Sequence, residues 1–360
     1  MMKRSPYCSG YLIHYNSWGI IMNFFSNFDH IILMINRGLF RAPSARLLHE
    51  LGKVGATALL AAIAAPLLAA GDIVRPPRSE EAPEVRLTEK VVTLPIVMVR
   101  EFPFIEGSAA GVSGKFMLDT GIESALSIND HRVPVTDART IGKGFFGSGQ
   151  TFEIHLVPEV RDVHIAALSY PSVTRVTSKD SRLLENDITP DFIGWFGYTA
   201  FANYAMKLDY RTLRATFYRQ GEADYLMGER VIAELPFETR KLPNIPIMPG
   251  SVGDIPVITD WDTGQYGIFY TSEEGKARLL KEGRLTPSKE KPDRLDLHGW
   301  ELNGHPMPDL KGIEVKTTPF PAAAPIGITE PDVLSLGYNI LSQFKTVWDY
   351  PGKRIYLLAR

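Results

Sequence analysis

The sequence predicts an all-β protein with two pseudo-symmetric lobes, and three observations support this. Twenty-six prolines and 30 glycines are spread through the 360 residues, which is typical of short strands joined by many turns. An Asp-Thr-Gly tripeptide occurs at residues 119–121 and again at residues 262–264. Shorter matches between the two halves follow each tripeptide at nearly constant spacing. The chain therefore looks like a duplicated unit with one copy in each half.

The duplication is visible around and after each tripeptide. Residues 103–119 and 246–262 share one order: an apolar strand, a turn containing Gly and Ser, and a second strand that ends at the Asp. The tripeptides are 143 positions apart, and a Gly-Tyr pair and an Asp-Tyr pair each recur after 140 positions. We expect each Asp-Tyr pair to begin a hairpin that closes its own lobe. The period is far longer than that of a solenoid, so two domains are predicted.

These matches place the domain boundaries. We expect an N-terminal extension with a signal peptide at residues 1–71, a spacer at 72–89, a first lobe at 90–222, a linker at 223–238 and a second lobe at 239–360.

The N-terminal region indicates export. Residues 54–71 form an Ala/Leu run that basic residues precede and small residues close, an order typical of a secretory signal. The alternative is a retained membrane anchor, although the run is short for a span and Pro66 interrupts it. We expect a periplasmic or extracellular protein, or in the alternative a membrane-anchored one. Met34 would be a more natural start for the signal, so we hypothesise that the translated start lies there.

Composition and motifs argue against several functions. A net charge of −2 disfavours nucleic acid as a partner. Cys8 is the only cysteine, so the chain has no internal disulfide and no cysteine-based metal site. It contains neither a Gly-x-Ser-x-Gly element nor a His-Glu-x-x-His element. We expect no metal and no cofactor, and the internal duplication favours a monomer.

The repeated tripeptide suits acid–base chemistry. Two carboxylates a few ångströms apart cannot both ionise comfortably, so Asp119 and Asp262 can share one proton. One can deprotonate a water molecule while the other, protonated, donates to a substrate carbonyl. The Thr hydroxyl can tie its turn to the opposite half, and the Gly allows a close backbone approach. The residues expected to position the carboxylates are Thr120, Gly121, Thr263 and Gly264.

On these residues, the chain resembles the aspartic proteases over most of residues 90–360. It resembles the two-lobed pepsin architecture, in which each lobe is similar to a retropepsin. The resemblance implies two acid-protease β-barrel lobes with a cleft between them and an endopeptidase that cleaves an extended polypeptide. It also implies an apolar-apolar-Gly element behind each catalytic turn. The candidates are residues 192–194 or, in a shifted register, 195–197 in the first lobe, and residues 335–337 in the second, where Ser335 is a weaker match.

The family also has a mobile hairpin, the flap, that covers bound peptide. Glycines surround two phenylalanines within residues 142–150, so Phe145, Phe146 and Gly147 are the flap candidates. The alternative is an ordinary glycine-rich loop whose phenylalanines enter the core. Residues 298–304 could form an opposing wall in the second lobe.

Three positions depart from the family pattern. Ile122 and Gln265 follow the tripeptides where the family has a small residue, and Asp260 stands two residues before Asp262. Residues two apart on a strand share a side, so Asp260 could approach Asp262 and raise the pKa of the pair. Alternatively the strand bulges and Asp260 is solvated. The departures leave a second function open, a non-catalytic peptide-binding protein on the same fold.

Overall fold

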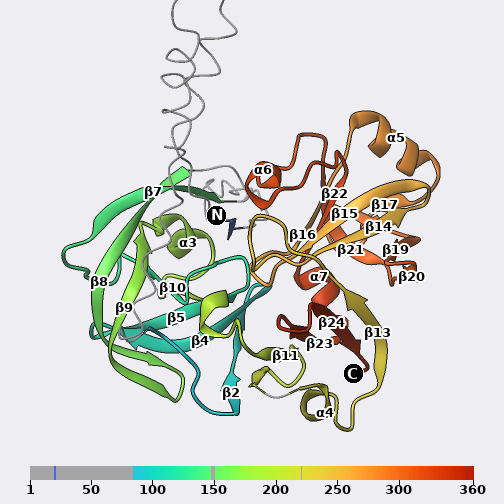
Figure 1. Cartoon of the computed structure of the whole chain (residues 1–360). Coiled ribbons are helices and arrows are strands. Elements are labelled where there is room, and N and C mark those ends of the chain that lie inside the picture. Colours follow the sequence, from blue (N-terminus) through green and yellow to red (C-terminus); the bar gives the residue numbers. More distant parts are fainter. Residues whose placement is uncertain (1–19, 22–83, 147–150, 220) are drawn as a thin grey trace, which may run out of the picture. The chain divides into compact units, whose positions relative to one another are not determined.

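The computed structural model describes residues 20–21, 84–146, 151–219 and 221–360. In this part of the chain strands greatly outnumber helices, and the strands form three sheets (Figure 1). The predicted fold class, all-β with two pseudo-symmetric lobes, is confirmed. The expected signal segment, residues 54–71, lies outside the described residues.

The first lobe is built on a nine-stranded sheet. In spatial order its strands are β1 (Ile20–Ile21), β7 (Arg139–Phe146), β8 (Thr151–Ile165), β9 (Leu168–Lys179), β6 (Leu126–Asn129), β10 (Phe192–Gly197), β5 (Val112–Asp119), β4 (Phe102–Ala109) and β3 (Val97–Val99). An additional pairing of β8 with β4, at His164 and Ile165, returns the sheet to itself. Six strands, from β8 through β9, β6, β10 and β5 to β4, therefore close into a barrel.

The second lobe is built on another nine-stranded sheet. Its strands, in spatial order, are β17 (Leu285–Pro287), β18 (Leu295–Leu297), β21 (Leu310–Lys316), β16 (Gly267–Tyr270), β22 (Val333–Leu336), β15 (Ile255–Trp261), β14 (Ile247–Val252), β19 (Trp300–Leu302) and β20 (His305–Pro306). Among the described residues no pairing returns this sheet to itself, so it stays open.

The two sheets share the same central topology. In the first lobe β10 runs parallel to β5 and antiparallel to β6, which is parallel to β9. In the second lobe β22 runs parallel to β15 and antiparallel to β16, which is parallel to β21. The last four residues of β5 and of β15 are buried, because each strand lies between two neighbours deep in its sheet. The predicted duplication is thus a structural one.

A third, six-stranded sheet contains strands from both halves. Its order is β13 (Val231–Pro236), β24 (Arg354–Leu358), β23 (Lys345–Asp349), β11 (Ala205–Asp209), β12 (Arg214–Tyr218) and β2 (Val91–Pro95). The Asp-Tyr hairpins, expected to close their own lobes, instead pair with each other through β11 and β23. The segment expected as a linker, residues 223–238, contributes β13 to this sheet. Edge strand β2 alternates exposed and buried residues, as a strand with one covered face should.

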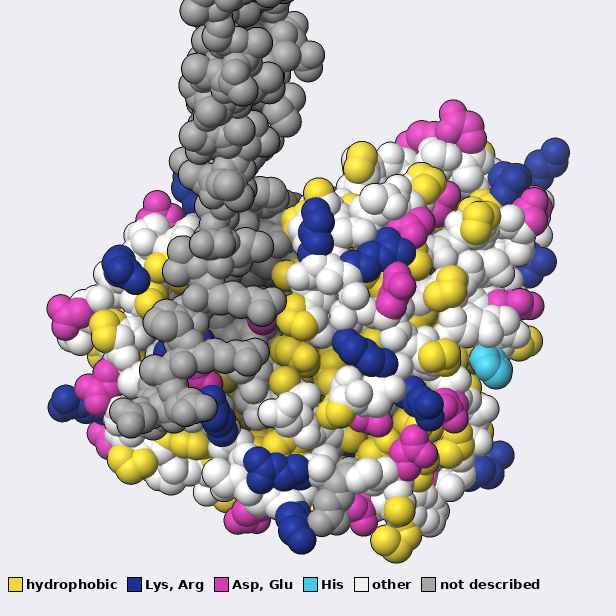
Figure 2. All heavy atoms as spheres, in the orientation of Figure 1, with side chains coloured by type: hydrophobic (Ala, Val, Ile, Leu, Met, Phe, Trp, Pro, Cys, Tyr) yellow, Lys and Arg dark blue, Asp and Glu magenta, His cyan; other side chains and the backbone are white. Residues whose placement is uncertain are grey.

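Within the part of the chain that the structure describes, helices are few and short. They are α3 (Arg182–Asp187), η1 (Tyr198–Ala200), α4 (Glu222–Tyr225), α5 (Glu273–Lys281), α6 (Ala323–Ile326) and α7 (Tyr338–Leu341). Within the described ranges, no helix is long and apolar enough to cross a membrane. Acidic and basic side chains are interspersed over the face shown in Figure 2.

Candidate active site

The two Asp-Thr-Gly turns lie where β5 and β15 end. Asp119 lies opposite Gly197 in the parallel pairing of β5 with β10, and the Asp262 N–H donates to the Leu336 carbonyl of β22 at 3.0 Å. The tyrosines that follow Gly197 and Gly337 also bind the residue after each tripeptide. Tyr198 N donates to the Ile122 carbonyl, and Tyr338 N donates to the Gln265 carbonyl, both at 2.9 Å.

A glycine behind each turn makes this packing possible. A methyl group on Gly197 would overlap the carbonyl oxygens of Ile122 and Ser124, and one on Gly337 would overlap the carbonyl oxygen of Gln265. These glycines end the two apolar-apolar-Gly elements. Of the two registers considered for the first lobe, residues 195–197 therefore lie behind the Asp119 turn.

The two threonines link the turns by exchanging hydrogen bonds. Thr120 N donates to Thr263 Oγ1 at 3.0 Å, and Thr263 N donates to Thr120 Oγ1 at 3.0 Å. Thr263 Oγ1 also donates to the Leu118 carbonyl at 2.8 Å. All of these groups are buried, so the bonds fix the distance and orientation of one turn relative to the other.

The carboxylates face each other across this link. Gly121 N donates to Asp119 Oδ1 at 2.8 Å and Gly264 N donates to Asp262 Oδ1 at 2.7 Å, so each tripeptide binds its own Asp. Gly121 N also lies 3.1 Å from Asp262 Oδ1. A methyl group on Gly264 would lie within 2.6 Å of the Asp119 carboxylate, so the first carboxyl packs against the glycine of the second turn.

Burial dominates the ionisation of both carboxyls. Burial and the neighbouring charge of Asp262 raise the pKa of Asp119 well above its usual range. Burial also raises the pKa of Asp262, to about 6, although the N–H groups of Gly264 and Gly121 and a hydrogen bond with Asp119 oppose the rise. Because both pKa values are raised, that of Asp262 to about 6, the pair still holds a proton at near-neutral pH.

The residues around each carboxyl differ in kind between the lobes. Three positions are compared: two residues before the Asp, one residue after the tripeptide, and two residues before the glycine behind the turn. In the first lobe they hold an apolar triplet: Met117, Ile122 and Trp195. In the second lobe the topologically equivalent positions are occupied by a polar triplet: Asp260, Gln265 and Ser335. The equivalence follows from register, because Met117 pairs with Trp195 and Asp260 pairs with Ser335.

The polar triplet is one hydrogen-bonded cluster. Ser335 Oγ donates to Asp260 Oδ2 at 2.8 Å, and Gln265 Nε2 donates to Ser335 Oγ at 2.6 Å. Burial raises the pKa of Asp260 to about 7, the Ser335 hydrogen bond opposes the rise, and the charge of Asp262 adds to it. Asp260 lies within regular β15 and is 1 % exposed, so neither a bulge nor solvation separates it from Asp262. The sequence singled out all three residues separately, but not their contact.

A buried lysine near the first carboxyl was not predicted. Lys179, the last residue of β9, is fully buried, and its charge lowers the pKa of Asp119 against the larger effects of burial and Asp262. Burial lowers the pKa of Lys179 itself to about 7, which the charges of Asp119 and Asp130 oppose. Nothing in the sequence distinguishes this lysine from the partly exposed Lys316, which also ends a strand.

The flap candidates lie only partly within the described residues. Phe145 and Phe146 end β7, where Phe145 pairs with Thr151 of β8, and Gly147 lies outside the described residues. The proposed opposing wall, residues 298–304, contains β19, which pairs with β14.

No family model matches the chain, and no curated protein matches it. Among solved structures, the chain is similar to basic 7S globulin from soybean, with 11% sequence identity and a TM-score of 0.46 over 75% of this chain and 95% of that one.

Proposed function

We propose that the chain is an aspartic endopeptidase that hydrolyses peptide bonds with Asp119 and Asp262. One observation carries this proposal: two buried carboxyls, each bound to its own Gly N–H, on turns that exchange Thr hydrogen bonds. This arrangement holds two carboxyls close enough for coupled ionisation and leaves one proton between them. A purely structural pair of turns would not need two carboxyls in contact.

The hydrogen bonds suggest which carboxyl holds the proton. Asp262 Oδ1 accepts from two backbone N–H groups, whereas Asp119 Oδ1 accepts from one. Hydrogen bonds to the ionised form favour it, so Asp262 is the stronger acid and Asp119 keeps the proton. Asp262 would then deprotonate the attacking water, while Asp119 donates to the carbonyl oxygen as it becomes tetrahedral. No covalent intermediate is required.

We further propose an exported protein whose substrate is an extended polypeptide. The motifs support the substrate class because an extended backbone can pair with strand edges near the turns. The Ala/Leu run at residues 54–71 supports export.

Substitution of each aspartate tests the activity. Asp119→Asn and Asp262→Asn should each lower the rate of peptide hydrolysis by about three orders of magnitude, because neither variant can share a proton. Asp296→Asn is the matched control, since Asp296 is buried and accepts a backbone N–H from Gly312 at 2.8 Å but lies outside the site. Hydrolysis of a mixed peptide library, measured by mass spectrometry, gives the rates. Wild-type turnover that persists in Asp119→Asn contradicts the proposal.

A non-catalytic peptide-binding protein is the second candidate, and the polar triplet favours it. Asp260 adds a third buried carboxyl beside Asp262, which makes the shared proton harder to remove at neutral pH. Calorimetric titration with a statine-containing peptide separates the candidates. Binding without any cleavage of library peptides, across pH 3 to 8, supports the binder.

A further inference from the structure

The strongest unassigned feature is Lys179. Among the described residues it is the only lysine or arginine that is fully buried. Burying an ammonium group is costly unless opposite charges or aromatic faces compensate, so its position demands an explanation. The proposed reaction assigns it no role.

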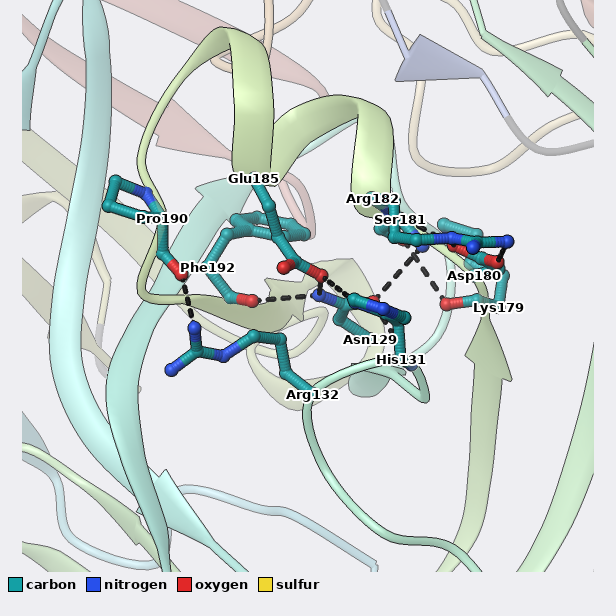
Figure 3. A network of polar contacts seen from close by, with 10 residues as sticks. All are labelled: Asn129, His131, Arg132, Lys179, Asp180, Ser181, Arg182, Glu185, Pro190 and Phe192. Atoms are coloured by element: carbon teal, nitrogen blue, oxygen red, sulfur yellow. Dashed lines mark hydrogen bonds and ion pairs between the residues drawn. The ribbon is translucent and has the colours of Figure 1, made fainter.

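The backbone at Lys179 is held firmly by a polar network (Figure 3). Lys179 pairs with Asn129 across β9 and β6, and its carbonyl accepts from Ser181 Oγ at 3.2 Å. The same carbonyl accepts from Asp130 N, also at 3.2 Å. Asn129 accepts from Ser181 N at 3.0 Å and donates to the Phe192 carbonyl at 2.9 Å. Three elements, β6, β9 and β10, thus converge where the lysine side chain leaves the backbone.

The side chain lies among aromatic rings. Lys179 Nζ is 3.6 Å from the ring centroid of Trp195 and 4.9 Å from that of Phe152. Trp195 belongs to the apolar triplet and pairs with Met117, two residues before Asp119. Both rings offer a favourable face to a cation, and Trp195 places the ammonium group next to the strand pair that ends at the first lobe's catalytic turn.

Two carboxylates interact with this ammonium group. They are Asp119 of β5 and Asp130, which follows β6. Asp130 already accepts from Ser178 Oγ at 2.9 Å and from His155 Nδ1 of β8 at 3.1 Å. Among the described residues, three other acidic groups of the first lobe have partners of their own: Glu153 with His155, Asp180 with Arg182, and Glu185 with His131.

The second lobe has no buried cation at the equivalent position. Register places Lys316 of β21 at the corresponding position, because it pairs with Tyr270 of β16 as Lys179 pairs with Asn129 of β6. The Lys316 side chain is 27% exposed and its Nζ lies 3.5 Å from Glu314 Oε1. Only the first lobe, then, places a buried cation beside its catalytic turn.

We propose that Lys179 is a positioning residue of the aspartate pair: its buried ammonium group stabilises the single negative charge that the pair carries while its two carboxyls share one proton. The inference rests on the proposed function for its consequence in catalysis, but the charge effect itself does not. Asp130 already accepts hydrogen bonds from Ser178 and His155, and Lys179 is the cation that acts on Asp119.

The first experiment uses the full-length protein and its pH–rate profile. Lys179→Met should move the acidic limb of kcat/KM upward by about one pH unit, a tenfold change in proton affinity, because the ionised pair loses its counter-charge. Lys316→Met is the matched control and should leave the profile unchanged. Lys179→Arg restores the charge and should return the limb toward that of the wild type. A merely structural lysine would lower the rate without moving the limb.

The second experiment needs no activity. Carboxyl ¹³C NMR follows the titration of the aspartates directly, and Lys179→Met should raise the first pKa of the pair by about one unit. If the wild type cleaves no peptide, the endopeptidase proposal fails while this titration still tests Lys179. A Lys179→Met titration that moves only Asp130 overturns the inference. If the Met variant does not fold, the same carboxyl titration of Lys179→Gln tests the inference.

Discussion

The two lobes keep the same catalytic turn but surround it with opposite chemistry. Each turn has its own Gly N–H bound to its Asp and its own glycine behind it. Around these copies, the first lobe has the apolar triplet and the second has the polar triplet. Lys179 adds a cation on the apolar side, and Asp260 adds a carboxyl on the polar side.

This difference separates what the duplication had to keep from what it could change. The backbone geometry of the turn leaves no room for variation, because the groups that contact it are main-chain oxygens. The side chains of the apolar and polar triplets change the electrostatic potential at the carboxyls but not the backbone of the turns, so they can diverge. The pair is geometrically symmetric and electrostatically asymmetric.

The largest expected effect comes from the shared geometry. Gly337→Ala and Gly197→Ala should each lower the free energy of unfolding by about 3 kcal/mol or more, since the added methyl overlaps backbone oxygens that cannot move aside. Gly221→Ala is the control, because a methyl there meets no atom and φ is −76°. Urea denaturation measures all three. A much smaller loss in one lobe would show that its turn is not as constrained as its copy.

Sequence reasoning reached the geometry more easily than the electrostatics. The spacing of the two tripeptides and of the Gly-Tyr pairs predicts the duplicated strands. These motifs mark the strand ends, so equal spacing in the two halves indicates equal pairing of the strands. The Asp-Tyr hairpins were expected to close separate lobes, since local pattern cannot show that β11 pairs with β23 across a long sequence distance. The contact of Asp260 with Ser335 depends on the parallel register of β15 and β22 in the same way.

The buried lysine illustrates a different limit. Lys179 is surrounded by two rings, Trp195 and Phe152, and interacts with two carboxylates, Asp119 and Asp130. These four residues lie on four other segments, and none is near Lys179 in the sequence. A lysine at the end of an alternating strand is ordinarily exposed, as its equivalent Lys316 partly is.

Removing the Asp260 carboxyl should stabilise the protein at neutral pH. Burial raises the pKa of Asp260 to about 7 in the folded state, so its favourable contribution is complete below its ordinary pKa and is lost as pH rises through 7. Asn cannot ionise and can still accept from Ser335. Asp260→Asn should therefore gain on the order of 2–4 kcal/mol over the wild type at pH 8, and little at pH 4.

Thermal or urea unfolding at several pH values measures this difference. Asp296→Asn is again the control, because the pKa of Asp296 is lowered rather than raised, and its loss should destabilise the protein at pH 8. An Asp260→Asn advantage that does not grow with pH would mean that Asp260 is already ionised in the folded protein, with a counter-charge yet to be found.

The smallest effect tests whether the threonine link is itself symmetric. Thr263 Oγ1 accepts from Thr120 N and donates to the Leu118 carbonyl, whereas Thr120 Oγ1 accepts from Thr263 N. Thr263→Val leaves a donor and an acceptor of the first turn unpaired, and Thr120→Val leaves one donor of the second turn. We expect Thr263→Val to cost about 1 kcal/mol more than Thr120→Val in urea denaturation. Because the isosteric change preserves volume, equal losses would mean that the extra bond to Leu118 contributes nothing and that the two turns support each other equally.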